Sequence, residues 1–142
     1  MKIAEILRSK GATVHAVSAD DKISEAVKLL NEHNIGAVVV KNANDEPLGI
    51  LSERDVVRRL GKDGASVLSL PVKSCMTSDP VTCGIDAKVD EILACMTERR
   101  IRHIPVVNGD KLIGLISIGD VVKRKIEESE QEAAALREYI TS

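Results

Sequence analysis

The stretch GILSERDVV at residues 49–57 returns in nearly the same form as GLISIGDVV at residues 114–122. The match continues upstream, where Asp20-x-Lys22-Ile23 corresponds to Asp86-x-Lys88-Val89 at an offset of 66 residues, against 65 for the first pair. A single one-residue insertion or deletion therefore separates two copies of one unit. A repeat at fixed spacing sets the whole architecture and has to be considered before any single motif. We expect the two halves to pack on each other and to leave ligand-sized clefts between them.

Each copy has the same order of expected elements: strand, helix, strand, strand, helix. In the first copy the apolar residues at i, i+3, i+4 and i+7 of one helix are Ile23, Ala26, Val27 and Leu30. The expected strands of this copy cover residues 14–17, 37–40 and 48–51, and a second helix runs from Ser52 to about residue 60. In the second copy we expect a strand near 81–83, a helix over about 89–96, and a hairpin from 104–107 to 112–116. A short helix over residues 2–9 precedes the repeats, and a long helix starts near Gly119.

Composition narrows the function classes. The chain has 142 residues, of which 44% are hydrophobic and 30% charged, so it is globular, and its core must be aliphatic because it has one Tyr and no Phe or Trp. The net charge of −2 and the missing aromatic platforms argue against nucleic acid as a partner. No apolar run reaches the length of a membrane span and the N-terminus does not resemble a signal peptide, so we expect no membrane and a cytoplasmic location.

Catalytic and metal-binding patterns are missing from the sequence. There is no paired carboxylate, Ser/His/Asp set, Cys/His dyad or Gly-rich phosphate loop, and we therefore expect a protein that is not an enzyme and needs no catalytic cofactor. The cysteines Cys75, Cys83 and Cys95 are odd in number and lack C-x-x-C spacing, which argues against a disulfide frame or a zinc site. They are read as reduced, packed thiols, with a reactive thiol as the alternative.

The repeated element order, the G-h-h-S-x-x-D motif at each hairpin exit and the run His103-Ile104-Pro105-Val106 resemble a pair of CBS domains, also called a Bateman module. The resemblance covers about residues 8–130 and is closest to small stand-alone bacterial CBS proteins. It implies an α/β (α+β) fold with pseudo-twofold symmetry, in which small mixed sheets are flanked by helices and a long C-terminal helix follows. Residues 1–142 would form one module, with repeat 1 at about 8–64, repeat 2 at about 74–130 and a helical extension at about 127–142.

The two S-x-x-D motifs allow two interpretations. A carboxylate one turn into a helix can accept hydrogen bonds from the vicinal hydroxyls of a ribose, while the serine hydroxyl and the helix N-terminus face a phosphate. The alternative is a structural helix cap with an acidic third residue. Two copies in register favour a ligand role, and the two interpretations are compatible.

The resemblance also implies composite clefts, in which the Ser and Asp of one repeat face the first strand and hairpin entry of the other. The implied ligands are AMP, ADP or ATP, with NAD and S-adenosylmethionine as further members of the adenosyl class. Ser117 and Asp120 would face a first set of residues: Thr13, Val14, His15, Gly36 and Ala37. Ser52 and Asp55 would face a second set: Val81, Thr82, Ile101 and Arg102, with His103 and Pro105 in the adjoining strand.

Charge makes the two clefts inequivalent. Arg102 and His103 lie where the resemblance places phosphate-binding cations, whereas repeat 1 has Gly36 and Ala37 at the same positions. The surrounding run Arg99–His103 can also be read as a solvated helix end, and His15 as a packed neutral histidine. Phosphates from two ligands could converge on this shared charge near the twofold axis, or one of the two clefts could be empty.

Two functions of different classes follow. The first is an adenine-nucleotide sensor that acts through rearrangement of the repeats or of a homodimer and is read by an unknown regulated protein. The second is a ligand-independent oligomerisation or scaffold module that binds a partner through its C-terminal helix. In either case we expect residues 127–140 to pack against the N-terminal helix or a dimer mate, because their apolar line would otherwise be exposed.

Overall fold

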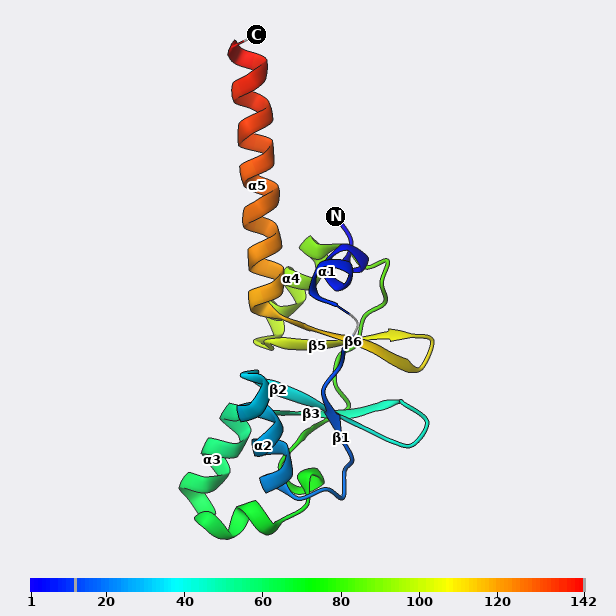
Figure 1. The fold of residues 1–142 in the computed structure, drawn as a ribbon, viewed down its shortest axis with the longest axis vertical. Helices are drawn as coiled ribbons and strands as arrows, with labels where there is room; N and C mark the ends of the chain where they lie inside the picture. The colour runs from blue at the N-terminus through cyan, green and yellow to red at the C-terminus, as the bar shows by residue number, and fades with distance from the viewer. Residues whose placement is uncertain (12, 142) are drawn as a thin grey trace.

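A computed structural model describes residues 1–11 and 13–141 of the chain. Two α/β halves are stacked along the long axis of the molecule, and a single long helix extends beyond the second half (Figure 1). The α/β class and the long C-terminal helix expected from the sequence are confirmed, as is the order helix, strand, strand, helix in both halves.

The first half is built on a four-stranded sheet in the order β1-β2-β3-β4. Strand β1 (Ala16–Val17) runs parallel to β2 (Ala37–Lys41), and β2 pairs antiparallel with β3 (Pro47–Ser52). Helices α2 (Ile23–His33) and α3 (Glu53–Asp63) complete the unit. The buried strand face and the helix stripe form one aliphatic core that includes Val38, Leu51 and Ile23, each with no exposed surface.

Strand β4 (Thr77–Ser78) was not expected from the sequence. It comes from the connection between the halves and pairs antiparallel with β3 through Gly49 and Ile50. It therefore extends the first sheet with residues from the start of the second repeat. This places the segment after β4 along the boundary between the two halves (Figure 1).

The second half has a two-stranded sheet, β5 (His103–Asn108) and β6 (Lys111–Ser117), with helix α4 (Val89–Arg99). The strand expected near 81–83 is wrong, because this segment makes only one parallel bridge, between Cys83 and Val106. In the first half the N–H of Val39 donates to the His15 carbonyl at 3.2 Å. The corresponding bond would need an N–H from Pro105, and proline has none, so the ladder cannot reach back to Val81.

The halves exchange their leading segments. Helix α1 (Ile3–Lys10) lies on the second half, where Ile3 and Ile6 are buried with Met96 and Ile104. The first half is covered instead by the connection, which forms two short 3₁₀ helices, η1 (Ala65–Ser69) and η2 (Val72–Ser74), and buries Val67 and Val72. Each half is thus covered by the segment that precedes the other half in the sequence.

Helix α5 (Ile118–Thr141) begins where β6 ends and continues well past the body. Its first turns are held to α1 by an ion pair from Arg124 to Glu5 at 3.0 Å, with Val121 buried. All residues from Ser129 to Thr141 are exposed, so the expectation that residues 127–140 cover the N-terminal helix is wrong, while packing on a dimer mate stays a prediction. The final residue of the expected tail, Ser142, lies outside the described residues. No helix in the described ranges is both long and apolar enough to cross a membrane.

Candidate ligand-binding cleft

The first S-x-x-D motif forms a capping box at the start of α3. The Asp55 N–H donates to Ser52 Oγ at 3.2 Å, and Asp55 Oδ2 accepts from both the Ser52 N–H and the Ser52 hydroxyl at 2.9 Å. The structural interpretation of the motif is therefore confirmed for this copy. Both of these side-chain bonds end on Oδ2, so Oδ1 is the carboxylate oxygen that a ligand would use.

The second motif repeats this geometry and adds a cation. Asp120 Oδ2 accepts from the Ser117 N–H at 2.9 Å and from Lys10 Nζ of α1 at 2.7 Å. Burial alone would raise the pKa of Asp120, but the hydrogen bonds from Lys10 and Ser117 outweigh it and hold that pKa below its usual value. The carboxylate of the second motif is thus ionised and paired within the chain.

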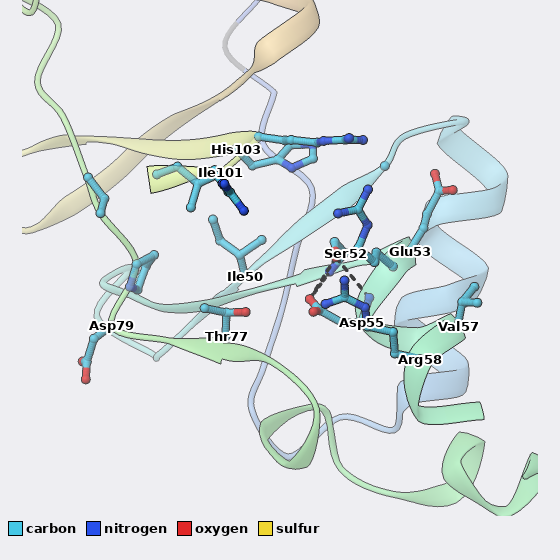
Figure 2. A pocket seen from close by; sticks show the side chains of 16 residues that line it. Ile50, Ser52, Glu53, Asp55, Val57, Arg58, Thr77, Asp79, Ile101 and His103 are labelled. Carbon is cyan, nitrogen blue, oxygen red and sulfur yellow. Dashed lines mark hydrogen bonds between the residues drawn. The ribbon is translucent and has the colours of Figure 1, made fainter. Parts of the chain in front are cut away.

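A cleft of about 720 Å³ lies between the two halves beside the first motif. It brings together seven of the residues expected to bind a ligand: Gly36, Ser52, Asp55, Val81, Ile101, Arg102 and His103. Figure 2 shows Ile50 and Ile101 inside this cleft, with Ser52 and Asp55 farther along its wall and His103 above. A volume of this size falls in the range of small-molecule and cofactor sites.

The lining of the cleft combines apolar side chains with cationic ones. Pro80 and Val81 from the connection lie with Ile50 and Ile101, which come from different halves. The cations of the lining are four arginines: Arg54, Arg58, Arg100 and Arg102. They outnumber the three carboxylates in the lining, which belong to Glu53, Asp55 and Asp79. Such a lining can accept both a flat apolar group and an anion.

Two residues of the lining meet directly across the boundary between the halves. A Cβ atom placed on Gly36 would lie 3.7 Å from His103 Nε2 and 3.6 Å from Glu53 Oε1. Burial lowers the pKa of His103 below its usual value, and the charge of Lys10 lowers it further, against an opposing effect of Asp120. His103 is therefore neutral near pH 7 and serves there as a hydrogen-bonding group rather than as a cation.

The remaining candidate residues are not in this cleft. Gly36 and Ala37 were expected opposite Asp120, but Ala37 pairs with Ser52 in the sheet and the Gly36 carbonyl accepts from the Glu53 N–H, so both belong to the Asp55 side. Pro105 is buried in β5, Ser117 ends β6, and Thr82 is exposed beside Val81.

Asp120 lies in a second, smaller cavity of about 190 Å³ whose lining includes Lys10, Lys123 and Arg124. Three residues were expected to face Asp120 but do not line this cavity: Thr13, Val14 and His15. The ring of His15 instead stacks on His33, with centroids 3.8 Å apart. Burial lowers the pKa of His15, helped by the positive charges of His33 and Lys10, which favours the interpretation as a packed neutral histidine.

Arg54 and Arg58 were missed by the sequence analysis. They are four residues apart on α3 and so lie on one face of the helix. Both line the cleft together with Asp55. The second copy has Gly119 and Lys123 at these positions. Comparing the charges of the two copies position by position would have identified Arg54 alone, because Lys123 keeps the positive charge of Arg58.

Within residues 1–11 and 13–141 the cysteines form no disulfide and the acidic residues belong to no metal-binding cluster. All three thiols are free, and burial raises the pKa of Cys83 to about 11 and also raises that of Cys75. Thiols with raised pKa values are poor nucleophiles near neutral pH. No cluster of three potential metal ligands occurs in these ranges.

The fold and the cleft define a tandem-repeat module whose ligand-sized site lies between homologous halves. The sequence profile of the CBS domain matches residues 3–62 and again residues 72–127. The chain belongs to the CBS domain family.

Similar proteins come from plants and bacteria. The mitochondrial CBS domain-containing protein CBSX3 of Arabidopsis thaliana is 38% identical over 97% of this chain and 71% of its own length. A crystal structure of the CBS-domain containing protein ATU1752 from Agrobacterium tumefaciens is 41% identical, with a TM-score of 0.83 over 88% of this chain and 99% of that one.

Two solved structures of the same fold contain adenosyl ligands. CBSX2 in complex with AMP is 22% identical, with a TM-score of 0.74 over 90% of this chain and 98% of that one. The CBS domain pair of MJ0100, in complex with 5-methylthioadenosine and S-adenosyl-L-methionine, is 21% identical, with a TM-score of 0.80 over 90% of this chain and 98% of that one. At these identities the likeness is one of fold.

Proposed function

We propose that this chain is a regulatory module that binds an adenosine phosphate, such as AMP, ADP or ATP, in the cleft beside Asp55. The observation that carries the proposal is the composition of the cleft. The Asp55 carboxylate, part of the capping box of α3, lines it together with arginines from both halves. The two solved structures of this fold that hold AMP and S-adenosylmethionine support the adenosyl class of ligand.

The groups that line the cleft suit the parts of a nucleotide. The apolar residues Ile50, Val81 and Ile101 accept the adenine ring, and Asp55 Oδ1 accepts from the ribose hydroxyls. The Val81 carbonyl adds an acceptor for the adenine amino group, because Pro105 cannot supply the N–H that the equivalent carbonyl of His15 receives. The arginines then face the phosphates.

Charge also ranks the members of the adenosyl class. S-adenosylmethionine carries a positive sulfonium and a positive amino group against a single carboxylate, and a wall of four arginines disfavours this net positive charge. An adenosine phosphate brings the opposite charge and can be held bidentately by the planar guanidinium groups. We therefore expect AMP, ADP or ATP to bind more tightly than S-adenosylmethionine, with NAD between them.

A regulatory output follows from the hydrogen bonds that connect cleft residues to the start of α5. The Ile118 N–H at the start of α5 donates to the Arg102 carbonyl at 2.8 Å, and His103 pairs with Ser117 in the sheet. A phosphate that draws Arg102 and His103 toward the first half would shift the base of α5. Ligand occupancy could then be read by a regulated protein to the extent that the ligand binds one arrangement more tightly than the other.

The exposed apolar residues of α5 favour one alternative, a scaffold module that binds a partner without any nucleotide. Ile126, Leu136 and Ile140 are all more than half exposed on the chain. This alternative makes no use of the cleft, and nucleotide titration separates the two functions.

The test is isothermal titration calorimetry of the chain with AMP, ADP, ATP, NAD and S-adenosylmethionine. Asp55→Ala and Asp120→Ala form a matched pair, since each removes the carboxylate that bonds the Ser N–H at the start of a helix and should cost about 1 kcal/mol of stability. Only Asp55→Ala should weaken nucleotide binding, by about 10- to 100-fold for the loss of charged hydrogen bonds. Absence of binding at millimolar nucleotide, or equal losses in the two variants, would reject the proposal.

A further inference from the structure

The C-terminal part of α5 presents an unpartnered apolar face to solvent. It extends away from the body, clear of α1 and α4 (Figure 1). Its large apolar side chains are strongly exposed, with fractions of 53% for Ile126, 60% for Leu136 and 72% for Ile140. The face that α5 turns to its own body, through Val121 and Arg124, is a different one.

The exposed face has the spacing of a coiled coil. Steps of four and three alternate along one row of residues: Val122, Ile126, Ser129, Ala133, Leu136 and Ile140. These steps define heptad positions in which Ile126, Ala133 and Ile140 are a, and the other three are d. Isoleucine at a together with leucine at d favours a parallel pair of helices over larger assemblies. The row therefore fits one partner helix of the same kind.

The charges beside this row distinguish a parallel from an antiparallel pair. In a parallel pair, g of one helix faces e of the next heptad in the other, so that Glu132 faces Arg137 of the second copy and Lys125 faces its Glu130. Both contacts join opposite charges. Lys125 already forms an ion pair with Asp90 at 2.9 Å within the chain. The contact between Glu132 and Arg137 is therefore the main ion pair that favours the parallel orientation.

An antiparallel pair brings like charges together. With the apolar layers aligned, Ile126 would face Leu136 and Ser129 would face Ala133 of the second copy. Glu132 would then lie beside Glu132, Glu130 beside Glu130, and Lys123 beside Arg137. Each of these contacts is repulsive, so the charge pattern opposes this orientation.

From these observations we propose that α5 pairs with α5 of a second copy as a parallel two-stranded coiled coil over residues 122–140. The bodies of the two copies then lie at the same end of the pair, second half near second half. This assembly does not depend on the proposed nucleotide site, because none of its contacts involves the cleft. It also gives the expected dimer a defined orientation.

Cysteine crosslinking of the full chain tests the orientation. In the parallel pair Ser129 faces its own copy, so Ser129→Cys should form a 129–129 disulfide dimer under mild oxidation, identified by peptide mass spectrometry. Ala135→Cys, on the outward c position of the same helix, is the matched control and should form none. The linked-peptide readout separates the new disulfide from any formed by Cys75, Cys83 or Cys95. Absence of the 129–129 link would overturn the proposal.

Charge exchange supplies a second test, read as the dimer dissociation constant in sedimentation equilibrium. Arg137→Glu should weaken a parallel dimer by about three- to tenfold, because two symmetric ion pairs become repulsive, and Glu132→Arg combined with Arg137→Glu should restore it. In an antiparallel dimer Arg137→Glu would instead strengthen association by removing the repulsion from Lys123. A strengthened dimer, an unchanged one, or a wild-type chain that stays monomeric would each contradict the proposal.

Discussion

Lys10 Nζ lies 2.7 Å from Asp120 Oδ2, the same carboxylate oxygen that accepts the Ser117 N–H. The counterpart oxygen, Asp55 Oδ2, accepts only from Ser52 among the side-chain hydrogen bonds recorded for the described residues. Both motifs share the bond from the Ser N–H to the carboxylate, and the second adds the Lys10 ammonium. That group comes from α1, which packs on the second half, whereas Met76 stands at the position equivalent to Lys10 in the connection that covers the first half.

Removing this ammonium should open the second site. In Lys10→Ala, Asp120 loses its intramolecular partner and becomes free to accept from a ribose, so the stoichiometry of AMP binding should rise from one to two per chain. Titration calorimetry measures this number directly. Arg8→Ala removes an exposed cation two residues away on the same helix and should keep one site. A stoichiometry of one in Lys10→Ala would mean that something other than this ion pair closes the cavity.

Pro105 should control how the adenine edge is read. Pro105→Val, which introduces the residue found at the same position of the first copy, adds an N–H that can bond the Val81 carbonyl. That carbonyl would no longer be available to the adenine amino group, so AMP affinity should fall by about 2- to 10-fold for one hydrogen bond. Stability should change little, since the gained bond is offset by the greater freedom of the unfolded chain without the proline.

Inosine monophosphate makes this test specific, because it has a carbonyl where AMP has the amino group. The wild-type chain should prefer AMP over inosine monophosphate, and Pro105→Val should lose that preference. Pro47→Val in β3 is the control for a general effect of replacing a strand proline and should leave the preference intact. An unchanged preference in Pro105→Val would show that the Val81 carbonyl does not read the base.

The pKa of His103 predicts how stability depends on pH. Burial lowers this pKa in the folded state below the value of about 6.5 for an unfolded histidine, so protons bind the unfolded chain more readily. The free energy of unfolding should therefore be constant above about pH 7 and fall as the pH drops toward 5.5. His15, whose pKa is also lowered, contributes in the same direction.

Urea denaturation at pH 7.5 and 5.5 measures the effect. His103→Gln keeps a polar side chain of similar size without the titration, so its loss of stability over this range should be smaller than that of the wild-type chain. His15→Gln should remove a separate part of the pH dependence of the free energy of unfolding. If His103→Gln retains the whole pH dependence, the histidine is not held neutral by the fold.

The fold was largely predictable because most of its elements are determined by local sequence patterns. The helix stripe around Ile23 and Leu30, the hairpins and the capping motifs each depend on residues close together in the sequence, and each was found where expected. The failed strand near Val81 had the opposite cause. Its pairing depends on the N–H of a residue 24 positions later, and Pro105 does not have one.

The site was predicted in part for the same reason. Asp55, Val81 and Ile101 could be assigned to one cleft because the resemblance implies which ends of the repeats face each other. Arg54 and the wall formed by Thr77, Asp79 and Pro80 could not, because β4 is two polar residues without a pattern of its own and pairs only with β3. Lys10 was missed because the ion pair to Asp120 joins residues 110 positions apart.

Gly49 and Gly114, which occupy the same position in the two copies, should respond differently to alanine. A Cβ on Gly49 would lie 2.7 Å from the Thr77 carbonyl oxygen and 2.7 Å from Met76 Sδ, and the backbone of β4 cannot move aside without leaving β3. A Cβ on Gly114 would lie 2.6 Å from Leu7 Cδ2, the end of a flexible side chain that can rotate away.

Gly49→Ala should therefore cost about 1–3 kcal/mol in urea denaturation, as overpacking of a tight contact does, and Gly114→Ala clearly less. Displacement of β4 also moves the cleft wall formed by Thr77, Asp79 and Val81, so Gly49→Ala should weaken AMP binding, whereas Gly114→Ala should not. Calorimetry of both variants with AMP provides the comparison. Equal binding by the two variants would show that the position of β4 does not govern the nucleotide site, and would leave Asp55 and the arginines as its only determinants.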